Sequence, residues 1–240
     1  MKYWVTGDFH AQYIALKERI KYTEPGDAII VLGDACFNYY GDEKDKKLKN
    51  MVNALGRTIY CIRGNHEMRP KDVPGMKQVY DENIESYVNM EDEWPNIKYL
   101  WDGMKYKING FNCLVIGGAY SVDKEYRLMR GWNWFSNELL TSEEMSFIED
   151  WHRGKDVDFI LSHTCPLSFQ PRDMFLTFID QSKVDNSMET WMEEFKNKIN
   201  WKYWLFGHYH GDRIIQPGVR MFFNDIAELN EELAYDRNIS

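Results

Sequence analysis

Five short apolar runs in this 240-residue sequence end abruptly in Asp, Asn or His, and this repeated pattern constrains the fold more than any other feature. The runs are continuous rather than alternating and are rich in Val, Ile, Leu and aromatic residues, which is typical of strands buried on both faces of a sheet. Helix-like segments separate them, so a mostly parallel sheet in an α/β fold is predicted. The runs cover residues 3–5, 28–32, 58–62, 159–161 and 203–206.

The polar residues that follow these runs are expected to meet in one place, because ligands of α/β sheets bind beyond the carboxyl ends of the strands. Glycine precedes several of them and lets the backbone turn sharply. Five of the six histidines in the chain fall at these ends, a concentration that scattered surface histidines do not explain. The residues concerned are Asp8, His10, Asp34, Asn65, His66, His163, His208 and His210.

Side chains of these types are ligands of first-row divalent metals, with Mn as the first candidate and Fe, Zn, Co or Ni as alternatives. Seven of them, all but His66, are too many for one ion but suit two, and the Asp34 carboxylate could bridge both. Two ions about 3.5–4 Å apart can stabilise a phosphoryl displacement and generate hydroxide near neutral pH. His66 has no evident ligand role and fits a general acid that protonates the leaving oxygen.

Length, charge and cysteine content restrict the number of domains, the classes of binding partner and the cellular location. Because Asp8 and His210 lie near opposite ends of the sequence, residues 1–240 are interpreted as a single domain. The net charge of −9 argues against nonspecific binding of nucleic acid, although bound cations would still allow an anionic substrate. No apolar run approaches 18 residues, so no membrane span is expected. The four cysteines form no Cys-x-x-Cys pair, which predicts buried free thiols and a cytoplasmic location.

The middle of the chain carries a different pattern. Residues 68–95 contain three prolines, a glycine and many acids, and are interpreted as an irregular excursion that forms a lid or insertion over the site. Three apolar runs follow at 97–101, 104–108 and 113–116, with turn signals at Asp102-Gly103 and Asn109-Gly110. These runs predict a second, more antiparallel sheet.

The polar motifs, taken together, resemble those of the calcineurin-like metallophosphoesterase superfamily in their order and over nearly the whole chain. The matching motifs are Gly7-Asp8-Phe9-His10, Gly33-Asp34, Gly64-Asn65-His66-Glu67, His163 and Gly207-His208-Tyr209-His210. The resemblance implies a four-layer α/β/β/α sandwich with a dinuclear site between the sheet ends and His66 as the catalytic histidine. The implied ligands are Asp8, His10, Asp34 and His210 for one ion, and Asp34, Asn65, His163 and His208 for the other.

Arginines near these motifs are candidates for substrate binding. Arg63 resembles the arginine that precedes the same motif in Ser/Thr protein phosphatases of this superfamily, where it holds phosphate in a bidentate geometry. Those phosphatases carry Asp-Arg-Gly after the second motif, whereas residues 35–41 here contain no Arg, so the chain is more similar to small bacterial and phage-borne members. Arg127 and Arg130 are further candidates for a phosphate contact, and pairing with surface acids is the alternative.

The function expected from these observations is hydrolysis of a phosphomonoester or phosphodiester by direct attack of metal-bound hydroxide. The substrate would be a phosphorylated small molecule, a nucleotide or a phosphoprotein. A non-catalytic, metal-binding interaction scaffold of the same fold is one alternative, which the intact ligand set disfavours. A nuclease is another, which the acidic charge and the lack of a basic stripe disfavour.

Overall fold

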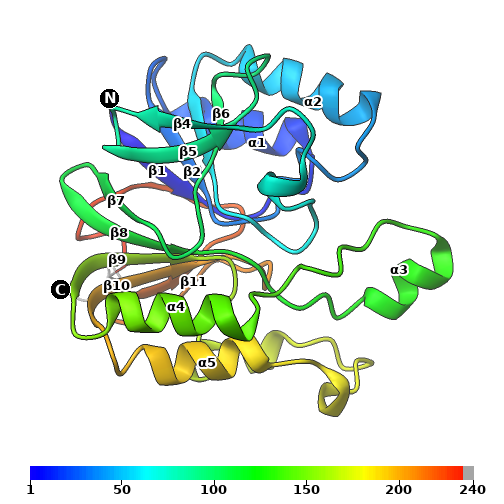
Figure 1. Ribbon diagram of the computed structural model, residues 1–240, viewed down its shortest axis with the longest axis vertical. Helices are drawn as coiled ribbons and strands as arrows, with labels where there is room; N and C mark the ends of the chain where they lie inside the picture. The colour runs from blue at the N-terminus through cyan, green and yellow to red at the C-terminus, as the bar shows by residue number, and fades with distance from the viewer. Residues whose placement is uncertain (235–240) are drawn as a thin grey trace.

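The computed structural model describes residues 1–234 and places two β-sheets face to face between two layers of helices (Figure 1). In spatial order, the first sheet contains β13 (Ile226–Glu228), β1 (Tyr3–Thr6), β2 (Ala28–Val31), β3 (Thr58–Cys61), β6 (Ile97–Tyr99), β5 (Ser86–Met90) and β4 (Lys77–Asp81). The second contains β11 (Arg213–Gln216), β12 (Val219–Met221), β10 (Asn200–Phe206), β9 (Asp156–Ser162), β8 (Phe111–Ile116) and β7 (Lys105–Ile108). The predicted four-layer α/β sandwich is confirmed.

Helices cover the outer faces of both sheets. Helices α1 (Tyr13–Arg19) and α2 (Glu43–Asn53) pack on the first sheet, and α4 (Ser142–His152) and α5 (Ser187–Phe195) pack on the second (Figure 1). The short helix α3 (Lys124–Arg130) projects away from these layers. Single 3-10 turns occupy Ile20–Tyr22, Pro70–Asp72, Leu167–Phe169, Arg172–Met174 and Gln181–Lys183. In residues 1–234, no helix has the length and apolar character needed to cross a membrane.

The continuous apolar runs reflect burial on both faces of each sheet. Side chains alternate along a strand, so neighbouring residues enter different cores. In β2, Ile30 packs into the core between the two sheets, whereas Ile29 packs into the core under α1 and α2. In β10, Leu205 and Trp204 divide in the same way between the central core and the core under α4 and α5.

Antiparallel pairing is shared by both sheets rather than concentrated in the second, as the sequence led us to expect. Strands β1, β2, β3 and β6 are parallel neighbours in the first sheet, and β8, β9, β10 and β12 are parallel neighbours in the second. The antiparallel pairs lie toward the edges of both sheets. The run at 97–101 accounts for the difference, because it supplies β6 to the first sheet instead of starting the second.

The segment 68–95 is more regular than its sequence suggested. Its second half forms the hairpin of β4 and β5, which extends the first sheet beyond β6. Val88 is buried in the central core, while Tyr80 and Tyr87 are exposed and pack edge to face on the outside. The hairpin therefore extends the first sheet, and a lid or insertion role for 68–95 stays a prediction.

Candidate metal centre

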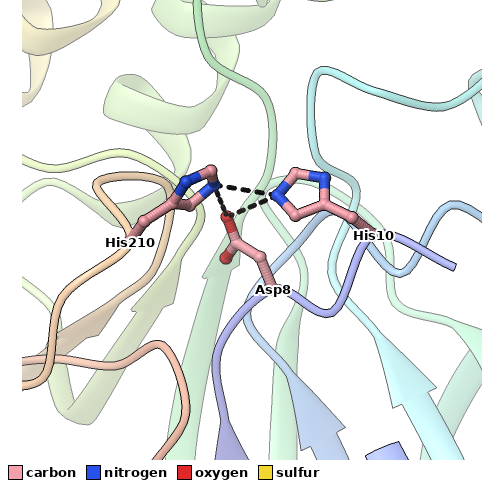
Figure 2. A group of neighbouring side chains, drawn as sticks. All are labelled: Asp8, His10 and His210. Atoms are coloured by element: carbon pink, nitrogen blue, oxygen red, sulfur yellow. Dashed lines mark hydrogen bonds and ion pairs between the residues drawn. The ribbon is translucent and has the colours of Figure 1, made fainter. Parts of the chain in front are cut away.

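The strand ends identified in the sequence converge from two sheets. The first sheet supplies the residues after β1, β2 and β3, and the second supplies those after β9 and β10. Within each sheet these strands are parallel, so their carboxyl ends share one edge of that sheet. Contacts of Asp8 and Asp34 with histidines of the second sheet bring the two edges together. Figure 2 shows the result for Asp8 and His10, which follow β1, and His210, which follows β10 and approaches from the opposite sheet.

The turns that present these side chains are conformationally unusual. Asp34 and His10 have φ values of 46°, and His208 and His210 have values of 67° and 53°. Residues other than glycine seldom adopt this left-handed region, and such residues concentrate at functional sites where the surrounding structure holds them. Four of the predicted ligands are thus held in a backbone conformation that packing has to enforce.

Glycines in the motifs are required by close approach. At three of them, an added Cβ atom would collide with a predicted metal ligand. A Cβ at Gly33, Gly64 and Gly207 would lie 2.0 Å from His163 Nδ1, 1.9 Å from Asp34 Oδ1 and 2.3 Å from Asp8 Oδ1, respectively. These three glycines therefore provide space for a ligand side chain from another strand end.

One cluster combines Asp8, His10 and His210 (Figure 2). The Nε2 atoms of His10 and His210 are 2.8 Å apart, and they lie 3.8 Å and 3.6 Å from Asp8 Oδ2. Asp8 is fully buried, and His208 donates its backbone N–H to the Asp8 carboxylate. Two imidazole nitrogens and a carboxylate oxygen that point at one another form a suitable donor set for a divalent ion.

A second cluster contains Asn65 and His163. His163 Nδ1 lies 2.8 Å from the carbonyl oxygen of Leu32, which can only accept, so Nδ1 carries the hydrogen. In the neutral ring, Nε2 then presents a lone pair 2.9 Å from Asn65 Oδ1, which is also an acceptor. Two acceptors at this distance require a proton or a metal ion between them, so the pair fits a metal site.

Asp34 joins the two clusters. Its Oδ2 lies 3.6 Å from His163 Nε2, 3.8 Å from His66 Nε2 and 3.9 Å from His10 Nδ1. Its Oδ1 accepts a hydrogen bond of 2.8 Å from the backbone N–H of His66, which fixes the orientation of the carboxylate. Asp34 therefore occupies the position that a bridging ligand would need.

Electrostatics at the centre favour a cation. Asp8 and Asp34 are buried, and within residues 1–234 the charged groups that approach them within 4.0 Å are histidines. Burial alone would lower the pKa of His163, but the two carboxylates outweigh it and raise that pKa to about 9. Protonation of His163 compensates the carboxylates in the metal-free protein, and divalent ions would supply that positive charge instead.

His208 is placed differently from the other predicted ligands. Its ring packs against the His163 ring with centroids 5.0 Å apart and lies outside the clusters of mutually close ligand atoms. Burial, together with the neighbouring His163, lowers the pKa of His208 to about 3, so the ring is neutral. A neutral imidazole is the form that binds a metal.

His66 lies at the rim of the centre beside Arg127. Its ring is 5.2 Å from the His10 ring, and an Arg127 Nη2 nitrogen contacts it. Burial lowers the pKa of His66, and Arg127 lowers it further, while Asp34 acts in the opposite direction. His66 also belongs to a cluster with His10 and Asp34, so the geometry alone allows it to be a ligand as well.

The three predicted substrate arginines occupy different environments. Arg127 is buried next to His66 and is held by Asp123 (Nε to Oδ2, 2.8 Å). Arg63 is also buried, but its guanidinium donates to Asp102 (3.0 Å) and to two backbone carbonyl oxygens, those of Glu138 (2.6 Å) and Gly117 (3.1 Å). Arg130 lies on the exposed side of α3, over the rings of Tyr126 and Trp132.

Sequence analysis did not single out Ser121 and Glu138, which adjoin the centre. Ser121 Oγ accepts a hydrogen bond of 2.9 Å from Asn65 Nδ2, and Glu138 Oε2 accepts one of 2.5 Å from Ser121 Oγ. A signal was present, because Gly117 and Gly118 follow β8 as glycines follow the other strands. The pattern of an apolar run that ends in Asp, Asn or His does not include this strand end, because none of these residues directly follows it.

Replacing Gly64 by Ala should displace the Asp34 carboxylate and weaken divalent metal binding. A loss of about tenfold or more in Mn²⁺ affinity is expected, comparable to the 10–100-fold cost of removing contacts that orient metal ligands. Calorimetric titration would measure it. Gly56→Ala is the control, because an added Cβ at Gly56 meets open space, and its φ of 67° tests whether backbone strain alone changes Mn²⁺ binding. Equal Mn²⁺ affinities in both variants would contradict the steric argument.

Comparison with known proteins agrees with the geometry. The family model for calcineurin-like phosphoesterases matches residues 1–212, which include the strand ends described above. No curated protein matched the sequence. With a match over most of its length and Asp/His clusters that could hold metal ions, the chain belongs to the calcineurin-like phosphoesterase family.

Proposed function

We propose that this protein is a dinuclear metal-dependent phosphoesterase that hydrolyses a phosphomonoester or phosphodiester. The observation that carries the proposal is the position of Asp34 between two donor clusters, with its Oδ2 within 3.9 Å of His10 and His163. That arrangement supports two ions that share a carboxylate. We assign Asp8, His10, Asp34 and His210 to one ion, and Asp34, Asn65, His163 and His208 to the other.

The chemistry of the proposal divides between ions and side chains. When bound, two divalent ions neutralise phosphate charge and lower the pKa of water, so that direct hydrolysis needs no covalent enzyme intermediate. The side chains fix the donor positions, since Asp34 and Asp8 are held by backbone N–H groups. The N/O donor set suits Mn, Fe, Zn, Co and Ni. Mn²⁺ is our first candidate, and the other four are alternatives.

We assign His66 as the general acid. It lies at the rim of the centre, partly exposed, where a leaving group could reach its ring. Burial lowers its pKa, Asp34 opposes this effect and Arg127 adds to it. A lower pKa makes the imidazolium a stronger acid and also reduces the fraction of the ring that is protonated. Its backbone N–H is committed to Asp34, so the ring position is tied to the bridging carboxylate.

We assign the phosphate contact to Arg127 rather than to Arg63. The Arg63 guanidinium donates to Asp102 and to the carbonyl oxygens of Glu138 and Gly117, none of which is a predicted metal ligand. Arg127 contacts the ring of His66 through Nη2. The same nitrogen could therefore donate a hydrogen bond to a phosphate oxygen bound beside His66. Asp123 holds the Arg127 Nε in place.

The substrate we propose is a phosphorylated small molecule, a nucleotide or a phosphoprotein, acted on in the cytoplasm. The four cysteines are free and buried, which supports a reducing compartment. The sequence-wide net charge of −9 supports a substrate other than bulk nucleic acid.

The proposed function is tested by removing metals with a chelator and reloading the protein with Mn²⁺, Zn²⁺, Fe²⁺, Co²⁺ or Ni²⁺. Activity on p-nitrophenyl phosphate and bis(p-nitrophenyl) phosphate should return only after reloading, with two ions per chain by elemental analysis. Asp34→Asn should lose both ions or nearly both, together with activity. Two ions per chain without hydrolysis of either substrate would point to a scaffold instead.

His66→Ala should retain both ions but slow turnover by about 10²–10⁴-fold, the usual contribution of general acid catalysis. The loss should shrink for esters with acidic leaving groups, which need little protonation. Turnover across a series of substituted phenyl phosphates and metal content would be measured together. Loss of an ion, or equal losses for good and poor leaving groups, would contradict the assignment.

Arg127→Ala should impair monoester hydrolysis about ten- to hundredfold and diester hydrolysis less, because charged hydrogen bonds contribute about 1.5–3 kcal/mol and a monoester carries more charge. Metal content should not change. Arg130→Ala is the matched control on the same helix and should alter either rate less than about twofold, as expected for a surface position. The assignment is wrong if Arg130→Ala reproduces the loss and Arg127→Ala does not.

A further inference from the structure

Two glycines bring the chain after β8 to the metal centre. Gly117 N–H donates to Asp102 Oδ1 (2.7 Å), and Gly118 has a φ of 91°. A Cβ at Gly118 would lie 2.4 Å from the carbonyl oxygen of Glu138 and 2.7 Å from the guanidinium nitrogens of Arg63. Only glycine allows the backbone to approach Glu138 and Arg63 this closely. The segment then places the buried Ser121 beside the amide nitrogen of Asn65, whose amide oxygen faces His163.

The hydrogen bonds at Ser121 have a fixed direction. Asn65 Nδ2 can only donate, so Ser121 Oγ accepts from it at 2.9 Å. The Ser121 hydroxyl must then donate its own hydrogen to Glu138 Oε2, 2.5 Å away, because a carboxylate only accepts. This chain holds the Asn65 amide with its nitrogen toward Ser121 and its oxygen toward His163 Nε2, 2.9 Å away.

The Glu138 carboxylate is itself held in place. Its Oε1 accepts from the Ser121 backbone N–H at 3.0 Å, and its Oε2 accepts from Trp134 Nε1 at 3.0 Å. Arg63 Nη1 donates to the Glu138 backbone carbonyl at 2.6 Å. Glu138 is 3% exposed, so water competes little for these contacts. A buried carboxylate with this many donors directed at it is a rigid acceptor for the Ser121 hydroxyl.

We propose that Ser121 and Glu138 are positioning residues that set the orientation of the Asn65 amide and thereby the affinity of one of the two metal ions. The proposal rests on the proposed two-metal function. Without Ser121 Oγ, the Asn65 amide nitrogen loses its acceptor, and the amide can rotate to place NH₂ where its oxygen lies now. An NH₂ group cannot bind a cation. Residues that orient metal ligands typically account for 10–100-fold in metal affinity.

The test is calorimetric titration of Mn²⁺ into metal-free wild-type protein, Ser121→Ala and Ser136→Ala. Ser136 is exposed in the same segment and serves as the matched control. In Ser121→Ala, one of the two binding events should weaken about 10–100-fold while the other is unchanged. Ser136→Ala should match the wild type. Thermal unfolding of the metal-free proteins checks that Ser121→Ala is folded.

Distinct outcomes separate this inference from the proposed function. A wild-type protein that binds fewer than two Mn²⁺ ions overturns the two-metal proposal and the inference with it. Two wild-type events that are unchanged in Ser121→Ala, or weakened equally, overturn the inference alone. If Ser121→Ala does not fold, Glu138→Gln gives the same test. Both Glu138 oxygens accept from Ser121, so the NH₂ group of the introduced glutamine would face a Ser121 donor in either orientation and displace Ser121. Unchanged titration of that variant also overturns the inference.

Discussion

Two buried carboxylates, Asp8 and Asp34, are the constraint on which the centre depends. Like charges removed from water are costly unless positive charge or hydrogen-bond donors compensate them. The structure supplies both. The backbone N–H groups of His208 and His66 point at these carboxylates, and imidazoles surround them. Because these donors come from both sheets, compensation of the two acids also ties the sheets together at this edge of the sandwich.

The same requirement explains why the motifs combine glycine with a polar residue. A ligand from one strand end has to pass within van der Waals distance of the backbone at another. Gly64 faces Asp34, and Gly33 faces His163, so each close approach joins one motif to a residue of another. A glycine directly before a ligand in the sequence therefore indicates a close contact with a distant segment of the chain. Such contacts are rigid, which suits a site whose donors have to be placed before an ion arrives.

The sequence predicted the strands and their polar ends well, because burial on both faces leaves a local mark in each run. Pairing partners leave no such mark. The run at 97–101 looked like its neighbours 104–108 and 113–116. It nevertheless pairs directly and in parallel with β3, although the β4–β5 hairpin separates the two strands in the sequence. The environment of Arg63 is a similar case, and its predicted phosphate contact stays a prediction. Its charge was visible in the sequence, but its partner Asp102, 39 residues away, was not.

The segment between β8 and α4 shows how one connection can serve several parts of a centre. It contains Ser121, which contacts Asn65, and Glu138, which contacts Ser121. It also contains α3 with Arg127, which contacts His66. Asn65 and His66 are adjacent in the chain, so both contacts act on the same turn after β3. A shift of this segment would move the support of a metal ligand and the neighbour of the proposed acid together. Substrate preference and metal affinity are therefore expected to change jointly when its length or anchoring residues vary.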